Sequence, residues 1–476
     1  MPDRRVRSEG TLSVCMIVKN EADLLARCLR SIQPVADQII VVDTGSQDKT
    51  VEVAKNFGAK IFETEWRNDF AWARNISLDH ATSTWILWLD ADDVVPPESL
   101  PLITQLKQCK PDCVFGLIVR NQRPNDTGTE FVQARMFPNR PEIRFERRVH
   151  EQMMPSALRL GMVMEKREVV IEHHGYADPE TLKRKSRRNI ELMLQEYDPH
   201  HPDPVTAVEI ADSYQLIDEF GEAERWYRAV LAIAGAETGF PAIASQARTG
   251  LGNLFNRQNR FDLAIEELEA AVSLAPWRSD ALYALAVSHD MAGQPDTAIG
   301  ILRRIQALRP EPGQVGVDFR AAAIKATLRL IRILVEQNHR SDAVIEAEKA
   351  LAEYPERPEI ALMAGKAFLA ANDLMKALRV FEKSIALSPG GPHIDSYFGL
   401  WLIYRKAGKL DALAKSMESV RPLFEGTVRY WAAVRILMGD MSTIPERFNT
   451  DELEKEQGII SRDFFASIKR FLSPPH

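Results

Sequence analysis

The stretch Trp85-Ile-Leu-Trp-Leu-Asp-Ala-Asp-Asp93 decides the expected fold, because an apolar run ends abruptly at three carboxylates. An apolar run without alternation predicts a strand that helices cover on both faces, as in a mostly parallel sheet. Ligands of such sheets bind beyond the carboxyl ends of the strands. Carboxylate oxygens at that edge favour a hard divalent cation, Mg²⁺ or Mn²⁺.

The same aspartates could instead have a purely structural role. Asp92 or Asp93 would then cap a helix that begins after Pro96-Pro97. An EF-hand is disfavoured, because the segment lacks the loop glycine and the distal glutamate. The choice between a cap and a ligand site therefore depends on the residues at the ends of the neighbouring strands.

Two further apolar runs end in polar residues in the same way. Val18-Lys-Asn-Glu21 follows the first run, and Val41-Val-Asp-Thr-Gly-Ser46 follows the second. Short β-rich runs alternate with amphipathic stretches, which predicts an α/β fold whose strand ends converge. No G-x-G-x-x-G follows the first strand and the sequence holds no P-loop motif, so dinucleotide and P-loop folds are disfavoured. The predicted strands are 12–18, 38–42, 59–62, 85–89 and 113–119, with helices over 21–33, 48–57, 70–80 and 98–110.

The chain changes character near Pro204, where Ala- and Leu-rich amphipathic helices replace the β-branched runs. Prolines recur at a step of 34 positions (310−276 and 389−355), and alanines repeat that step (298−264 and 377−343). This is the period of tetratricopeptide repeats. The sequence therefore predicts an all-α solenoid of about six repeats over 205–425, interrupted by an insertion at 311–317. We expect a linking helix over 177–204 and a helical C-terminal cap over 426–476.

Composition limits the partners. The chain has 476 residues, a formal charge of −7 and no apolar run of the roughly 18–20 residues that span a bilayer. The basic stretch 183–188 is interpreted as a solvated helix face, so no nucleic acid is expected. Residues 1–10 lack the apolar core of a secretion signal, which predicts a cytoplasmic location. The oligomeric state stays open, with a homodimer among the alternatives.

Three segments, Ser13–Glu21, Val41–Thr50 and Leu89–Asp93, together resemble family 2 glycosyltransferases of the GT-A fold, over a domain at 11–176. The attached repeats and the segment Glu65–Asn75 resemble the subgroup that contains the sublancin S-glycosyltransferase. The resemblance implies an inverting, metal-dependent transferase that uses a nucleotide-sugar donor, with a UDP-sugar favoured.

The resemblance also implies roles for residues at the strand ends. Asp43 and Glu21 would contact the nucleobase and Asp90 the ribose, while Asp92 would bind the metal and Arg74 would face the diphosphate. Elementary chemistry agrees, because a divalent cation and a guanidinium both stabilise a diphosphate leaving group. Asp43 as a turn residue and Glu21 as a first-turn helix charge remain the structural alternatives.

Glu151 is the predicted catalytic base that takes the proton of the acceptor. It lies in Arg147-Arg-Val-His-Glu151, where this sequence departs from the acidic pair more common in the family. Downstream, His173 or His174 would complete the metal site. Neighbours in a strand point to opposite faces, so one of the two histidines can reach the ion.

Tetratricopeptide arrays present grooves for extended peptides, so we expect a protein or peptide acceptor, although the sequence identifies no acceptor-binding residue. Three alternatives are retained. The chain would be a transferase for cell-surface polysaccharide or lipid, a nucleotidyltransferase, or a repeat scaffold with a degenerate domain. The missing Gly-rich basic loop disfavours the second alternative, and the retained carboxylates disfavour the third.

Overall fold

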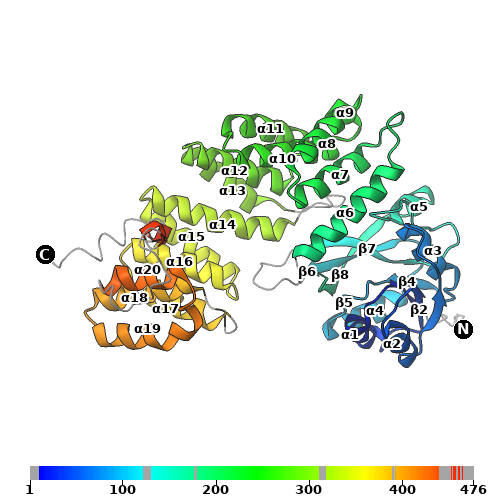
Figure 1. Ribbon diagram of the computed structural model, residues 1–476, viewed down its shortest axis with the longest axis horizontal. Helices are drawn as coiled ribbons and strands as arrows, with labels where there is room; N and C mark the ends of the chain where they lie inside the picture. The colour runs from blue at the N-terminus through cyan, green and yellow to red at the C-terminus, as the bar shows by residue number, and fades with distance from the viewer. Residues whose placement is uncertain are drawn as a thin grey trace, which may run out of the picture. The chain divides into compact units, whose positions relative to one another are not determined.

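The computed structural model describes residues 10–121, 130–175, 179–309, 318–388, 391 and 393–438, with 452, 454–456, 459–460 and 464. The predicted insertion at 311–317, the boundary at 176–178 and most of the predicted cap lie outside the described residues. The chain divides into two compact units, residues 1–288 with 308–321 and residues 289–307 with 322–476. The first unit therefore holds the α/β domain together with the first repeats (Figure 1).

An eight-stranded mixed sheet forms the α/β domain, in the order β3-β2-β1-β4-β7-β6-β8-β5. Its first four strands are parallel, and their carboxyl ends share one edge. They are β3 (Lys60–Glu63), β2 (Gln38–Asp43), β1 (Leu12–Val18) and β4 (Trp85–Trp88). These bounds agree within a residue or two with the strands predicted from the apolar runs.

The other half of the sheet departs from the predicted, mostly parallel arrangement. β7 (Glu130–Pro138) is antiparallel to both β4 and β6 (Val114–Asn121), and β8 (Met164–His173) is parallel to β6. The two-residue strand β5 (Asp93–Val94) then pairs antiparallel with β8. The sequence did not predict β5 or β7, because β5 is too short to show a period and β7 places Gln133 and Arg135 among apolar residues.

Alternation along β1 builds a core on each face of the sheet. Val14 and Met16 pack in a cluster that includes Leu25 and Ile103, whereas Cys15 packs in a second cluster that includes Leu78. A strand buried on both sides needs an uninterrupted apolar run, which is what the sequence has. The helices and the 3-10 turn of this domain are α1 (Ala22–Ile32), α2 (Thr50–Asn56), α3 (Phe70–Asp79), η1 (Pro97–Ser99), α4 (Leu100–Lys107) and α5 (Met154–Arg159).

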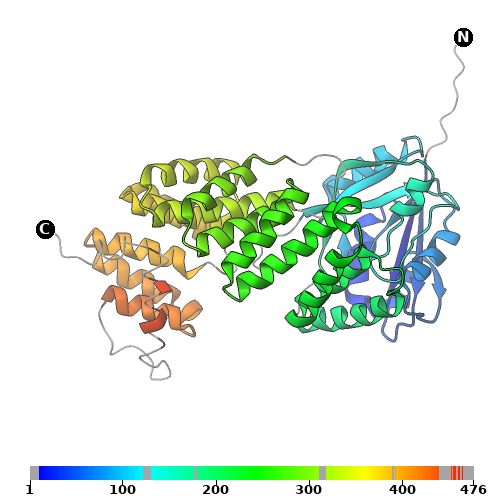
Figure 2. The ribbon, with the colours of Figure 1, turned by 90° about the horizontal axis from the view of Figure 1, so that it is seen from above.

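Helix α6 (Pro179–Glu196) leads into the repeats, whose helices run from green to orange in Figure 2. The described residues form six helix pairs there, together with the short helix α9 (Ala236–Gly239). The turn inside each pair has a residue with positive φ: Asp218, Asn259, Gly293, Asn338, Asn372 and Gly408. This left-handed residue ends the first helix of the pair and redirects the chain. The pairs are α7 (Pro204–Leu216) with α8 (Phe220–Ala232), α10 (Pro241–Arg257) with α11 (Phe261–Leu274), α12 (Ser279–Met291) with α13 (Pro295–Ala307), α14 (Phe319–Glu336) with α15 (Arg340–Glu353), α16 (Pro358–Ala370) with α17 (Leu374–Ala386), and α18 (Ile394–Lys406) with α19 (Leu410–Phe424), followed by α20 (Val428–Met438).

The predicted fold class, an α/β domain followed by helical repeats, is confirmed. Among the described residues, no helix combines the length and the apolar character that crossing a membrane requires.

Candidate active site

Three of the acids predicted for donor and metal binding lie at the carboxyl ends of the parallel strands β2 and β4. Asp43 ends β2, while Asp90 and Asp92 follow β4. A side chain within the turn after β4 stabilises that turn, since the Asp93 carboxylate accepts the Asp90 backbone N–H at 2.8 Å. Strand pairing then sets Asp93 opposite His173, the last residue of β8. A register that joins distant parts of the chain therefore brings the histidine to the acidic turn.

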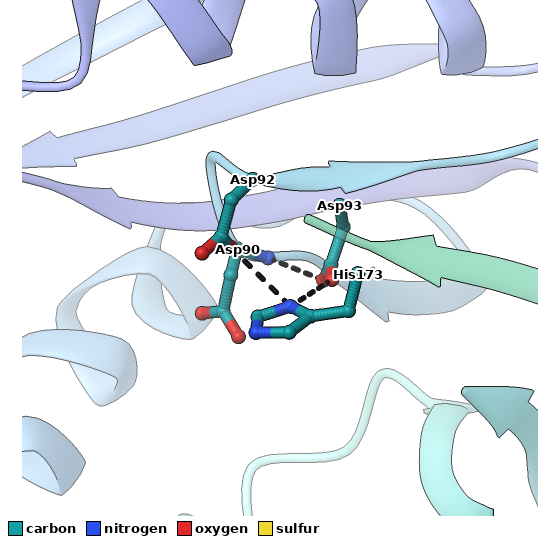
Figure 3. A group of neighbouring side chains, drawn as sticks. All are labelled: Asp90, Asp92, Asp93 and His173. Atoms are coloured by element: carbon teal, nitrogen blue, oxygen red, sulfur yellow. Dashed lines mark hydrogen bonds and ion pairs between the residues drawn. The ribbon is translucent and has the colours of Figure 1, made fainter. Parts of the chain in front are cut away.

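One ligand atom from each of Asp90, Asp92, Asp93 and His173 lies within 4.8 Å of the others (Figure 3). His173 Nδ1 lies 2.9 Å from Asp93 Oδ1 and 3.4 Å from Asp92 Oδ1. The side chain of His174 is instead directed to Glu172, at 3.6 Å, although its backbone N–H donates to the Asp92 carbonyl. Of the two predicted histidines, the structure therefore groups His173 with the acids.

Asp93 and Arg135 belong to this site, although sequence reasoning assigned them no role in it. Asp93 is completely buried and forms a 2.8 Å ion pair with Arg135 Nη1 from β7. Asp93 Oδ1 also lies 2.9 Å from His173 Nδ1, and in the tautomer with the proton on Nδ1 this carboxylate accepts it while Nε2 is the acceptor atom of the ring. A buried carboxylate that orients a histidine in this way is a common supporting group of protein metal sites.

Gly175 lies against the side chains of Asp92 and His173, where a side chain of its own would not fit. A Cβ atom on Gly175 would lie 2.2 Å from Asp92 Oδ2 and 2.7 Å from His173 Nε2. Both donor atoms therefore border the volume that a side chain at this position would fill. Carboxylate and imidazole donors suit Mn²⁺, and carboxylates alone suit Mg²⁺.

The pKa values of Asp90 and Asp92 shift in opposite directions. Burial by itself raises the pKa of Asp90, but Arg74 and Arg135 outweigh burial and lower that pKa to about 2. The pKa of Asp92 is raised by burial and by the charges of Asp90 and Asp93, against the opposing effect of His173. The chain thus compensates the charge of Asp90 well and that of Asp92 poorly. A cation bound at Asp92 would supply the missing compensation.

Arg74 of α3 joins the predicted nucleotide residue Asp90 to the predicted base Glu151. Its Nη2 donates to Asp90 Oδ1 at 2.7 Å and its Nε donates to Glu151 Oε1 at 2.6 Å. The guanidinium carbon lies 4.2 Å from the centre of the Trp88 ring. Its remaining nitrogen, Nη1, is buried without a hydrogen-bond partner in the described structure. One donor of Arg74 is therefore left for an anionic ligand.

Asp43 takes part in a turn and Glu21 lies at the start of a helix, as their structural alternatives predict. Asp43 Oδ1 accepts the backbone N–H groups of Gly45 and Ser46 at 2.9 and 2.8 Å, as in a turn. Its Oδ2 is buried and has no partner among the described residues. Glu21 occupies the N-cap of α1 without a side-chain capping bond, and its pKa is raised by burial and by Asp92. Among the described residues, each acid therefore has a carboxylate oxygen that forms no turn or capping hydrogen bond.

Comparison with known protein families identifies the family of the α/β domain. The glycosyl transferase family 2 pattern matches residues 13–164, and tetratricopeptide repeat patterns match 256–315 and 328–392. Residues 13–164 form a family 2 glycosyltransferase domain. The match confirms the resemblance that the three strand-end segments carry, and it includes every predicted site residue except His173 and His174.

The chain is also similar to two curated proteins over stretches longer than the matched domain. A TPR repeat-containing protein of Synechococcus elongatus is 33% identical over 269 residues, which cover 55% of this chain and 66% of that protein. The glycosyltransferase SunS of Bacillus subtilis is 30% identical over 200 residues, 40% of this chain and 47% of that protein. The chain therefore spans between about half and two thirds of the length of these relatives.

Solved structures resemble the chain weakly. A glucosyl-3-phosphoglycerate synthase of Mycobacterium tuberculosis, in complex with Mn²⁺ and UDP-glucose, is 22% identical and covers 24% of this chain and 43% of that chain, with a TM-score of 0.20. A likeness this slight does not identify the donor or the metal of the family 2 domain described here.

Proposed function

We propose that this chain is an inverting, metal-dependent glycosyltransferase, which moves a sugar from a nucleoside diphosphate donor to a protein or peptide acceptor. The proposal rests on one observation: Arg74, predicted to face the diphosphate, contacts both the predicted nucleotide residue Asp90 and the predicted base Glu151. Within residues 13–164, Arg74 joins Asp90 to Glu151. His173, which lies beyond the matched residues, is grouped with Asp90 and Asp92. Family membership supports the reaction, and the network supports the site.

On the donor side, Asp92 and His173 Nε2 would hold a divalent cation, Mn²⁺ or Mg²⁺. Such an ion neutralises the diphosphate oxygens and so stabilises the leaving group. Asp90 accepts hydrogen bonds from the ribose, and the free Oδ2 of Asp43, together with Glu21, accepts from the base of the nucleotide. Arg74 Nη1 donates to a diphosphate oxygen, a charge-assisted contact that strengthens as negative charge develops there.

On the acceptor side, Glu151 removes the proton of the attacking group while that group forms its bond to the sugar carbon. The bond from that carbon to the diphosphate oxygen breaks, so the displaced nucleoside diphosphate keeps the bonding electrons. Arg74 fixes the carboxylate of Glu151 at 2.6 Å. Because the same guanidinium is bonded to Asp90, it sets the distance between the base and the nucleotide.

The repeats support a protein or peptide acceptor. Tetratricopeptide patterns match 256–315 and 328–392, and stacked helix pairs of this kind bind extended peptides. Recruitment by the repeats would raise the local concentration of the acceptor around the transferase domain.

Incubation of the purified full-length chain with a panel of nucleotide sugars, with Mn²⁺, Mg²⁺ or EDTA, tests the reaction. Release of nucleoside diphosphate that EDTA abolishes is the expected result. Pyrophosphate would show nucleotidyl transfer instead. A chain that neither hydrolyses nor binds any donor would be a repeat scaffold. Thermal stabilisation by donor and metal provides the binding readout that separates these outcomes.

A further inference from the structure

The loop that ends in Glu151 has a strained backbone. It spans residues 147–151 and is closed by reciprocal backbone hydrogen bonds between Glu146 and Gln152, at 3.0 and 3.1 Å. Arg147 has φ of 75° and His150 has φ of 54°. Residues other than glycine seldom adopt these angles, so contacts around the loop must hold it in place.

The first repeat helix, α7, supplies such contacts at the start of the loop. Arg147 binds Glu209 through two parallel hydrogen bonds, Nη1 to Oε1 at 3.1 Å and Nη2 to Oε2 at 2.5 Å. Arg147 Nη2 also donates to the Thr206 hydroxyl at 3.0 Å. The side chains of Arg147 and Glu209 are 22% and 18% exposed, so water competes weakly for this pair.

Other contacts hold the remainder of the loop. The Arg148 carbonyl accepts the backbone N–H of Phe70, the first residue of α3, at 2.9 Å. At the end of the loop, Arg74 of the same helix holds Glu151. The loop is therefore fixed between a helix of the transferase domain and a helix of the first repeat, both within the first compact unit.

We propose that Arg147 and Glu209 are positioning residues, which set the location of the Glu151 carboxylate relative to Arg74 and Asp90. The inference rests on the proposed function, because it assigns the pair a role in transfer to the acceptor. It also makes the first repeat a part of the transfer machinery. Without Glu209, Arg147 loses its two hydrogen bonds to a carboxylate and keeps only the one to Thr206. The start of the loop is then held more weakly by α7, so the strained backbone relaxes and Glu151 shifts from its place beside Arg74.

The test compares Glu209→Ala with a matched control, Glu267→Ala, in the full chain. Glu267 of α11 pairs with Arg248 of α10 at 2.6 Å, with side chains 24% and 23% exposed, in the second helix pair of the same compact unit. Three quantities are measured: the turnover of sugar transfer, the affinity for nucleoside diphosphate with Mn²⁺, and hydrogen exchange at the amides of Glu146 and Gln152.

We expect Glu209→Ala to lower transfer turnover by about 10- to 100-fold, because displacement of a reacting group by about 1 Å has an effect of that size. Affinity for the nucleoside diphosphate should remain within about twofold, and Glu267→Ala should match the wild type. In the Glu151→Gln background, Glu209→Ala should cause no further loss of turnover, because its effect passes through Glu151.

Two results would overturn the inference. The first is equal exchange at Glu146 and Gln152 in Glu209→Ala and the wild type, which would show that the pair does not hold the loop. The second is a loss of turnover that multiplies with that of Glu151→Gln, which would indicate a general structural role. Failure of the proposed function has a different signature, since the wild type itself would transfer no sugar. In that case the hydrogen-exchange comparison is the only test of the inference. Faster exchange at Glu146 and Gln152 in Glu209→Ala than in the wild type would support it.

Discussion

Substitution of Gly175 by alanine should block the proposed cation site by one methyl group. A Cβ at Gly175 would approach Asp92 Oδ2 to 2.2 Å, whereas a carbon and an oxygen in ordinary contact are separated by at least about 3.3 Å. One of the two groups must therefore move by about 1 Å. The backbone at Gly175 lies outside the left-handed region, so alanine adds no backbone strain there.

The magnitude follows from this displacement. A shift of about 1 Å in a group that positions the reaction lowers the rate by about 100-fold, equivalent to about 2.7 kcal/mol at 1.36 kcal/mol for each factor of ten. Titration of donor hydrolysis with Mn²⁺, together with calorimetric Mn²⁺ binding, measures the effect. Affinity for Mn²⁺ should fall by about 10- to 100-fold, since misplacing a ligand resembles losing the group that orients it.

A matched control separates this effect from the general consequences of replacing glycine. A Cβ on Gly221, near the start of α8, would meet nothing within 4 Å, and its φ also lies outside the left-handed region. Gly221→Ala should therefore leave Mn²⁺ affinity and turnover unchanged. Wild-type Mn²⁺ affinity in Gly175→Ala would refute the assignment of Asp92 and His173 as the cation ligands.

Three further predictions concern the acids of the site. Asp92→Asn should abolish metal-dependent turnover while the unfolding midpoint stays within a few degrees of wild type, and activity that still responds to Mn²⁺ would contradict the metal role. Glu151→Gln should bind donor normally but transfer about 10²- to 10⁴-fold more slowly, which steady-state kinetics with acceptor will measure. Asp90 has a folded pKa of about 2, below the usual aspartate value of 3.8, so its pairing with Arg74 stabilises the fold above about pH 4, and this contribution is lost as the pH falls toward 2. The difference in urea midpoint between wild type and Asp90→Asn should shrink over that range, and a constant difference would contradict the pairing.

The parallel half of the sheet could be predicted because its information is local. Strands buried on both faces require continuous apolar runs, and the polar residues that end those runs mark the ligand edge. Asp43, Asp90 and Asp92 could therefore be placed at one edge from the sequence alone. Strand alternation likewise predicted that one of two neighbouring histidines could join the acids.

The remainder of the site depends on contacts between distant segments. Arg135 lies beside apolar residues of β7, and its buried charge is explained by Asp93, 42 positions earlier. The grouping of His173 rather than His174 with the acids follows from the register of β5 against β8. The loop at 147–151 has positive φ at Arg147 and His150, and an arginine in the sequence gives no signal of such a turn. Neither the register of β5 against β8 nor the conformation of this loop produces a periodic pattern in the sequence.

These distant contacts also determine where the transferase domain can be separated from the repeats. The composition changes near Pro204, which suggests a boundary there, but Thr206 and Glu209 lie beyond it and hold Arg147. A chain truncated at residue 205 would lose the repeats to which we assign acceptor recruitment and, at the same time, the contacts of Thr206 and Glu209 with the loop that carries Glu151. Loss of transfer in such a truncation would not distinguish the two causes. Glu209→Ala in the full chain removes the support and leaves the repeats in place, so it isolates the second cause.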